Sequence, residues 1–256
     1  MVKLANTADS KSAALKSLRV QLPLPAPHKQ YMRGYFRNTI LNKNKLLQSY
    51  IIGLAIGDGN LSNPNNRATR LRITCDKRYP LLIKRIVISL KKLLPDNKIG
   101  IVNREKGCVD VSVYSNHLEK LLGWKAKNGP KSNQKVTVPN WVKRKKEYKI
   151  NCLKGLIETD GSIYYDRGYK MVIFTTIIKE LAKDVHNIII SLGFSPHIYK
   201  VKKDKNSSGY NFNKKIEYHI RLSKGVSRFL DLVSPEKIDL KKQGLGLCFF
   251  IEGLFF

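Results

Sequence analysis

Acidic residues are scarce in this sequence. It has 19 Asp and Glu against 48 Lys and Arg in 256 residues, a formal net charge of +29. Such an excess of one sign repels itself in a folded chain, and a polyanion normally offsets it. The imbalance indicates a nucleic acid partner, bound with release of counterions, in preference to a generic solvated surface or an anionic membrane.

Cysteine and histidine are few, and neither has the spacing of a metal site. The four cysteines include no CxxC pair, so the sequence indicates neither a zinc framework nor a disulfide scaffold. The five histidines show no ligand spacing and no His-Asn-His nuclease signature. We therefore expect thiols in a reducing compartment.

Long apolar runs are also missing. No run approaches the roughly 20 residues that span a bilayer, and the opening MVKLANTADSKSAALK lacks the apolar core of a signal peptide. We expect no membrane partner and a location in a prokaryotic cytoplasm or an organelle. Hydrophobic residues still make up 42% of the chain, enough for a sizeable core.

The chain divides into four expected segments. Residues 1–41 form a basic arm, extended or poorly ordered, in which LPLPAPHKQ disfavours regular structure. Residues 42–140 and 141–240 form two similar repeats. For the apolar tail at 241–256, a final strand, a packing segment and a disordered end remain open.

Each repeat shows the same order of elements. In the first we expect a helix over 42–59, a strand in ATRLRITC, a helix over 79–94, a hairpin about 105–107 and a helix over 116–124. In the second we expect a helix over 142–161, strands within 162–176, a helix over 178–193, a hairpin within 195–223 and a helix over 224–233. A constant offset of 102 residues relates Gly53 to Gly155 and Asp58 to Asp160, which indicates duplication.

The first helix of each repeat ends in small residues and an aspartate. Gly53-x-x-x-Gly57 and Gly155-x-x-x-Thr159 would let two helix backbones approach closely, which brings Asp58 and Asp160 together. Two carboxylates at helix C-termini repel each other and the helix dipoles. A divalent cation, Mg²⁺ or another such as Mn²⁺, would relieve that repulsion, with the carbonyls of Gly57 and Thr159 as further ligands. A lone Asp-Gly would merely end a helix, but this one recurs in register.

The segments IIGLAIGDG and LKGLIETDG resemble the nine-residue motif of the LAGLIDADG homing endonucleases. The resemblance covers roughly residues 42–235. It implies an α+β fold of two tandem αββαββα units related by pseudo-two-fold symmetry, with saddle-shaped antiparallel sheets on DNA around two central motif helices. It also implies that Asp58 and Asp160 are the catalytic, metal-binding residues.

Two features of the motif surroundings are less regular. Position six of the motif, often acidic in the family, is Ile56 in the first copy and Glu158 in the second, and we interpret Glu158 as structural. The family often places a lysine or glutamine beside each active site. Here Lys131 and Lys135 are the candidates, with Lys200 and Lys202 as further ones.

Strand alternation predicts which side chains face DNA, because successive residues point to opposite faces. Mixed polar residues there suit base contacts, whereas lysines such as Lys143, Lys145 and Lys146 suit phosphates. The predicted DNA-facing residues are Arg70, Arg72, Thr74, Asp110, Ser112, Tyr114, Lys200, Lys202, Glu217, His219 and Arg221.

The sequence thus predicts a monomeric, Mg²⁺-dependent endonuclease that cuts a long, pseudo-palindromic double-stranded DNA target and promotes intron mobility. A maturase that binds its own intron RNA, a DNA-binding regulator without cleavage and a decaying nuclease are the alternatives. An intein is less favoured, because the chain starts with neither Cys nor Ser and does not end in His-Asn.

Overall fold

The structure is a computed structural model that describes residues 40–105, 107–202 and 216–238. The basic arm up to residue 39, the tip of the second long hairpin and the apolar tail therefore lie outside the described residues. No helix in the described part is long and apolar enough to cross a bilayer.

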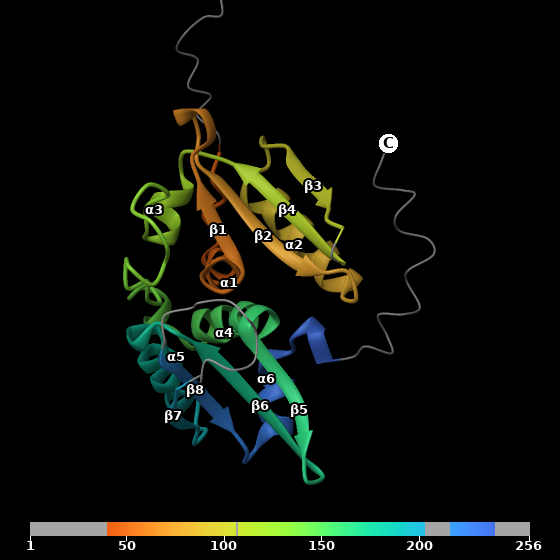
Figure 1. Ribbon diagram of the computed structural model, residues 1–256, viewed down its shortest axis with the longest axis vertical. Helices are drawn as coiled ribbons and strands as arrows, with labels where there is room; N and C mark the ends of the chain where they lie inside the picture. The colour runs from red at the N-terminus through yellow and green to blue at the C-terminus, as the bar shows by residue number, and fades with distance from the viewer. Residues whose placement is uncertain (1–39, 106, 203–215, 239–256) are drawn as a thin grey trace, which may run out of the picture. The chain divides into compact units, whose positions relative to one another are not determined.

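The elements follow the same order in both halves, and the predicted αββαββα plan is confirmed (Figure 1). The first half contains α1 (Lys45–Ile56), β1 (Gly59–Ser62), β2 (Arg70–Asp76), α2 (Pro80–Leu93), β3 (Ile99–Asn103), β4 (Cys108–Tyr114) and α3 (Leu118–Leu122). The second half contains α4 (Lys146–Asp160), β5 (Gly161–Asp166), β6 (Tyr169–Thr176), α5 (Lys179–Ser191), β7 (His197–Lys202), β8 (Ile216–Leu222) and α6 (Val226–Val233), followed by a short 3₁₀ turn η4 (Glu236–Ile238).

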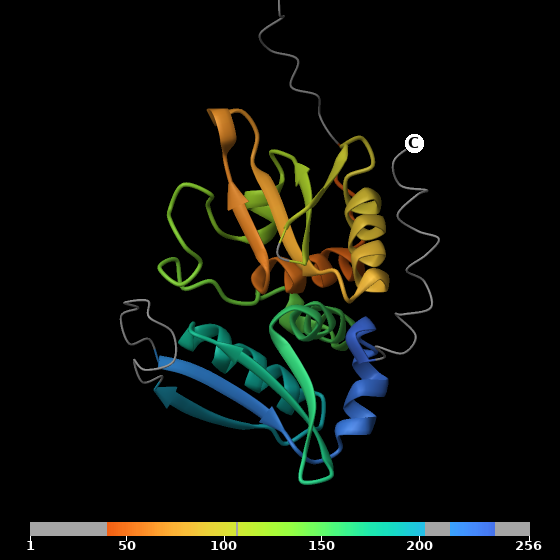
Figure 2. The ribbon, with the colours of Figure 1, turned by 45° about the vertical axis from the view of Figure 1, so that its right-hand side comes forward.

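Each half builds one four-stranded antiparallel sheet. The strand orders are β1-β2-β4-β3 and β5-β6-β8-β7, so the two sheets have equivalent topology. In both ribbon views α1 and α4 lie side by side between the two sheets (Figures 1 and 2). The fold is α+β, as predicted.

Strand alternation places the core on one face of the first sheet. Leu71 and Ile73 of β2 are fully buried opposite Val113 and Val111 of β4. The intervening residues of β2, beginning with Arg70, remain partly exposed on the other face. This period of two is what a sheet with one buried face requires.

Small residues allow α1 and α4 to approach closely. A Cβ atom added to Gly155 would lie 2.5 Å from the Tyr50 carbonyl oxygen and 2.6 Å from the Leu54 nitrogen, and one added to Gly53 would overlap the Cys152 carbonyl. A side chain at Gly57 would likewise overlap Thr159. Larger residues at these positions would force the helices apart, which explains both small-x-x-x-small patterns.

The first motif helix is shorter than the predicted 42–59. It begins after Asn44, whose side-chain oxygen accepts the Leu46 and Leu47 N–H groups at 3.0 and 3.2 Å. It ends at Ile56, and Asp58 lies in the turn before β1. Asp160, in contrast, is the last residue of α4.

Candidate active site and nucleic-acid interface

The two motif aspartates lie where α1 and α4 end. The charge of Asp58 raises the pKa of Asp160, so the two carboxylates are close enough to interact. Neither carboxylate has a hydrogen bond or ion pair to any of the described residues. The structure therefore brings together two acids whose oxygens are uncommitted.

Both carboxyl groups of this pair have a higher pKa than an isolated aspartate. Partial dehydration, followed by repulsion from Asp58, raises the pKa of Asp160 to about 6. Asp58 is exposed at the surface, but the surrounding protein partly dehydrates its carboxylate and raises its pKa as well. Lys131 and Lys237 oppose both shifts. A positive charge between the carboxylates would stabilise their ionised forms.

Lys131 is the predicted lysine that the structure brings to this pair. Its ammonium donates to the carbonyl oxygens of Ala55 at 3.3 Å and Ile56 at 2.5 Å, and also to that of Gly57. These carbonyls end α1 and have no partner within the helix. Dehydration lowers the Lys131 pKa, against the attraction of Asp160 and Asp58. Lys135, its predicted alternative, is exposed and has no contact with them.

Lys237 is a second lysine at the site, and the sequence analysis missed it. Its ammonium donates to the Thr159 carbonyl at 3.2 Å and the Gly161 carbonyl at 3.0 Å, at the end of α4. Dehydration lowers its pKa, against the attraction of Asp58 and Asp160. A spacing signal could have found it, because Lys131 lies 73 residues after Asp58 and Lys237 lies 77 residues after Asp160.

Glu158 of the second motif is buried, with 2% of its surface exposed. One carboxylate oxygen accepts the Tyr50 hydroxyl at 2.6 Å, and the other accepts the backbone N–H of Glu236 at 2.9 Å. Both oxygens are therefore committed to contacts inside the protein. The interpretation of Glu158 as structural agrees with these contacts.

The polar face of the first sheet is organised around Asp110. This carboxylate is 4% exposed, accepts the Thr74 hydroxyl at 2.7 Å and pairs with Arg104 and, at 3.9 Å, with Arg72. Burial opposes its ionisation, but the hydrogen bonds from Thr74 and Arg104 lower its pKa overall. The buried Nε of Arg72 has no partner in the described structure. Arg72 is thus held in place while part of its hydrogen-bonding capacity is unused.

Register shows which strand residues share that face. Arg70, Arg72 and Thr74 pair with Tyr114, Ser112 and Asp110, in the arrangement that alternation predicted. Their contact with DNA remains a prediction. In the second sheet Arg221 lies on the equivalent polar face, where it donates to Asp166 at 2.9 Å and has an unpartnered buried Nε. His219 lies on the same face and contacts Glu217 at 3.3 Å.

The prediction that Lys200 and Lys202 lie on the DNA-facing side of the second sheet is wrong. Lys200 pairs with Tyr218 and Lys202 with Ile216, which share a face with the buried Ile220. Paired residues point the same way, so both lysines lie on the helix side of the sheet. The β7 residues that share the face of His219 and Arg221 are instead His197, Tyr199 and Val201. Pairing with β8 fixes the face that each β7 residue occupies, and alternation within a single strand does not show which of its two faces is buried.

The donor set at the motif aspartates fits a divalent cation. No group of three or more His, Cys, Asp or Glu side chains suitable for a metal occurs among the residues described. Two carboxylates, completed by water and phosphate oxygens, suit Mg²⁺. The Gly57 and Thr159 carbonyls, also predicted as ligands, accept hydrogen bonds from Lys131 and Lys237. Asp58 and Asp160 are thus the ligands that have no other partner.

Residues 147–234 match the family model described as a LAGLIDADG-like domain. The match runs from α4 to α6 and so covers the second repeat. A DNA polymerase from Thermococcus sp. (strain GE8) is 26% identical in an alignment over 156 residues that covers 58% of this chain and 8% of that protein. The chain therefore spans a small part of this curated relative.

Solved structures of LAGLIDADG proteins share the fold. Variants of the homing endonuclease I-DmoI superpose with a TM-score of 0.53 at 20% identity, over 74% of this chain and 95% of theirs. I-DmoI in complex with DNA and Mn gives 0.52 at 21% identity, over 76% and 98%. Full-length DUF199/WhiA from Thermatoga maritima gives 0.52 at 12% identity, over 81% and 61%. Proteins with different names thus share this fold. The fold alone does not identify the function, which has to be inferred from the residues of the site.

Proposed function

We propose that this LAGLIDADG protein is a site-specific, metal-dependent endonuclease that hydrolyses both strands of a DNA target and promotes intron mobility. The observation that carries the proposal is the uncommitted pair Asp58 and Asp160, flanked by Lys131 and Lys237. Folding alone gives no reason to keep two partly dehydrated acids side by side. Metal-dependent phosphodiester hydrolysis gives a reason, because the two acids can hold a cation against a phosphate.

Asp58 and Asp160 would hold Mg²⁺ or Mn²⁺, which when bound lowers the pKa of water and stabilises charge on phosphate oxygens. The ammonium groups of Lys131 and Lys237 lie at the ends of the two helices, where they would stabilise negative charge on the phosphate. The polar faces of the two sheets would hold the duplex on either side. The DNA and Mn bound in I-DmoI support this class of ligand.

The duplicated fold also suggests the form of the target. Each half presents one sheet and one motif aspartate, so a single chain would read two half-sites with approximate two-fold symmetry. We propose a monomer, a long imperfect palindrome, and staggered ends with 3′ overhangs, the outcome that the family resemblance implies. The joined exon sequence around the gene is the first candidate target.

The deciding experiment replaces each motif aspartate separately. Asp58→Asn and Asp160→Asn should abolish cleavage of the joined-exon duplex, with affinity measured by fluorescence anisotropy without divalent ions changing little. Asp231→Asn, an exposed acid on α6, is the matched control and should cut normally. Cleavage at the wild-type rate by either motif variant would exclude the proposed site.

Salt dependence tests the basic surface independently of cleavage. If the protein neutralises roughly six to ten phosphates, its affinity should fall by about 10³ to 10⁵ between 50 and 200 mM salt. The slope of log Kd against log salt concentration measures the number of phosphate contacts. An affinity that does not change with salt concentration would contradict DNA binding through the basic surface of this chain, whose formal net charge is +29.

A DNA-binding regulator without cleavage is the alternative, because proteins that share a fold can differ in function. Both motif aspartates are retained here, which favours the nuclease. Binding of a defined duplex by wild-type protein with no cutting in Mg²⁺ or Mn²⁺ would favour the regulator. A maturase would instead accelerate splicing of its intron RNA.

A further inference from the structure

The turn η4 that carries Lys237 is attached to the second motif helix by Glu158. The Glu158 carboxylate accepts the backbone N–H of Glu236, the residue immediately before Lys237, at 2.9 Å. Its second oxygen accepts the Tyr50 hydroxyl of α1 at 2.6 Å. Tyr50 therefore orients the carboxylate that holds the turn.

The side chain of Glu236 is fixed as well. It pairs with Arg85 of α2 and lies 4.0 Å from Lys154 of α4. The backbone and the side chain of Glu236 are thus both anchored to the protein core. Lys237, the next residue, then reaches the Thr159 and Gly161 carbonyls at 3.2 and 3.0 Å.

We propose that Glu158 is a positioning residue for Lys237: it fixes the backbone one residue before the lysine and so holds the ammonium at the end of α4. The catalytic consequence rests on the proposed function, whereas the attachment itself does not. Holding a flexible lysine side chain costs conformational entropy. When its backbone is already fixed, only the entropy of the side chain is lost.

The first half explains why only one motif has this acid. Position six there is Ile56, and Lys131 lies in a loop that Gln134 braces internally. The Gln134 side chain accepts the Lys125 N–H and donates to the Lys125 and Gly129 carbonyls, each at 2.9 Å. That loop holds itself in shape, whereas η4 requires an acceptor on the motif helix.

Two substitutions at Glu158 separate the hydrogen bonds from the burial. Glu158→Ile introduces the residue of the first motif and removes both acceptors. Glu158→Gln keeps a carbonyl oxygen for the Glu236 N–H, and its amide can donate to the Tyr50 oxygen. Tyr50→Phe leaves the bond to Glu236 and removes only the orienting hydroxyl.

The first readout is the reactivity of Lys237 in metal-free protein, measured by acetylation and peptide mass spectrometry. Lys237 lines an open hollow of about 300 Å³, so a small reagent can reach it. In Glu158→Ile it should react roughly tenfold faster, the factor for losing one hydrogen bond to a charged group. Glu158→Gln should restore slow reaction, Tyr50→Phe should be intermediate, and Lys131 should not change.

Equal acceleration at Lys131 would mean general loosening and would overturn the proposal, as would an unchanged Lys237 rate in a Glu158→Ile protein that melts near the wild-type temperature. The second readout is nicking of each DNA strand, where Glu158→Ile should resemble Lys237→Met and the double variant should be no slower. If no variant and no wild-type protein cuts DNA while the labelling pattern holds, the nuclease proposal fails and the positioning role stands.

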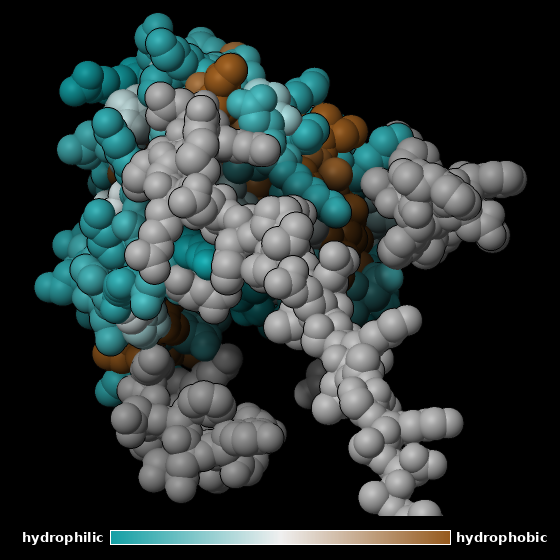
Figure 3. Space-filling model, turned by 90° about the horizontal axis from the view of Figure 1, so that it is seen from above, coloured by the Kyte–Doolittle hydropathy of each residue, from teal (hydrophilic) through white to brown (hydrophobic). Residues whose placement is uncertain are grey.

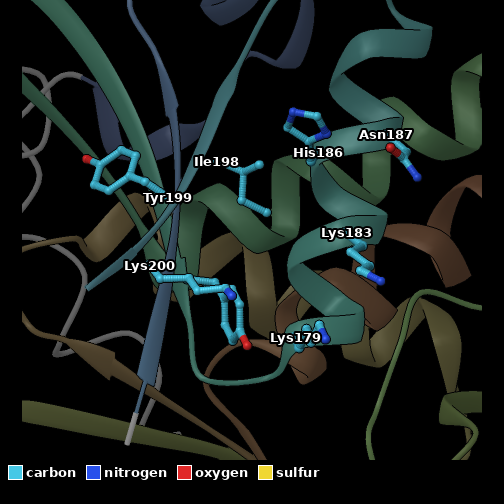
Figure 4. Close-up of a pocket in the computed structure, with 8 residues that line it drawn as sticks. Lys179, Lys183, His186, Asn187, Ile198, Tyr199 and Lys200 are labelled. Carbon is cyan, nitrogen blue, oxygen red and sulfur yellow. The ribbon is translucent and has the colours of Figure 1, made fainter. Parts of the chain in front are cut away.

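A second inference concerns a groove between α5 and β7, lined mainly from the helix side of the second sheet (Figure 4). Its volume is about 410 Å³, in the range of ligand sites. Lys179 and Lys183, one turn apart on α5, and Lys200 of β7 are among the residues that line it (Figure 4). Ile198 and Tyr218 supply apolar and aromatic surface.

The charges around this groove are unbalanced. No carboxylate lines it, and Lys179, Lys183 and Lys200 have no hydrogen bond or ion pair within the described ranges. Of the two acids on α5, Glu180 is not among the residues that line the groove, and Asp184 is occupied by Lys143 at 2.6 Å. Three free ammonium groups beside an aromatic ring are the combination that binds single-stranded nucleic acid, through phosphates and base stacking.

We propose that this groove binds a single-stranded nucleic acid segment, independently of the duplex site. The test uses labelled oligonucleotides of about 10 nucleotides, one of RNA and one of DNA. The double variant Lys179→Gln/Lys183→Gln should weaken single-strand binding by roughly tenfold and duplex binding by less than about twofold. The RNA and DNA probes show which sugar the groove prefers.

Lys120→Gln/Lys224→Gln removes the same charge from exposed positions elsewhere and serves as the control. An equal loss of single-strand binding in the control would show that the overall surface charge, and not the groove, binds the oligonucleotide, and would overturn the proposal. Unchanged binding in the groove variant would overturn it as well.

Discussion

In the first half of the molecule, the lysine beside the motif aspartates lies in a loop closed by its own hydrogen bonds. In the second half, the corresponding lysine lies on a short turn held by a buried carboxylate. Both ammonium groups nevertheless end at helix carbonyls, Lys131 on α1 and Lys237 on α4. The lysine charge therefore occupies an equivalent position in the two halves, although different contacts support it.

The polar faces of the two sheets also carry a similar group with different support. Arg72 on β2 is held beside the buried Asp110, and Arg221 on β8 is held by Asp166. The two arginines occupy different strands of their sheets, yet each side chain is 32% exposed with an unpartnered buried Nε. One fold therefore presents a similar group from two sequence positions. Away from the grey atoms, hydrophilic residues dominate the face in Figure 3.

The largest effect that distinguishes the halves should come from the two lysines. Lys131→Met and Lys237→Met should each slow cleavage by about 10², the usual effect of removing one charge-stabilising group. Because the lysines belong to opposite halves, the variants should slow opposite strands, which end-labelled substrates would reveal as different nicked products. Lys135→Met, in the same loop as Lys131, should cut normally. Slowing of the same strand by both variants would show that the two lysines do not serve opposite strands.

The two arginines should differ in the half-site that they affect. Arg72→Ala and Arg221→Ala should each weaken binding by about 1–3 kcal/mol, the value of one specific base contact. Base substitutions in one half of the target should become tolerated by the first variant, and substitutions in the other half by the second. Competition binding with substituted duplexes measures this. A uniform loss for all sequences would assign these arginines to phosphates.

The smallest effect concerns stability. The folded-state pKa of Asp160, about 6, is above the unfolded value near 4, so ionisation of Asp160 destabilises the fold. This destabilisation develops as the pH rises from about 4 to 6 and is complete above 6. Metal-free Asp160→Asn should therefore be more stable than wild type by on the order of 1–2 kcal/mol at pH 7.5, and equal to it near pH 4.

Urea denaturation at both pH values checks this stability difference. Asp231→Asn should show no gain, because that carboxylate is exposed on α6. Asp58→Asn should change stability in the same direction as Asp160→Asn, since dehydration raises its pKa too. A motif variant less stable than wild type at pH 7.5 would show that the aspartates support the fold.

Much of the candidate site could be predicted from the chain. The duplicated glycines and aspartates identified the helix pair, and alternation placed Arg70, Arg72 and Thr74 on one face, because both patterns act over a few residues. Lys237 escaped because its partners are 76 and 78 residues away along the chain. Lys200 was misplaced because strand register depends on a partner strand across a long hairpin.

Charge composition predicted a polyanion partner, and periodicity and small-residue spacing were enough to predict the two repeats, the α+β class and the pairing of the motif helices, because these patterns are visible along the chain. The sequence did not reveal which lysines approach the motif aspartates, which groups contact Glu158 or which β7 residues share the polar face, and the fold was needed to find them. Those outcomes depend on distances between segments far apart in the chain. Packing of the elements sets these distances. Buried donors and acceptors then form hydrogen bonds with whichever groups the packing places nearby.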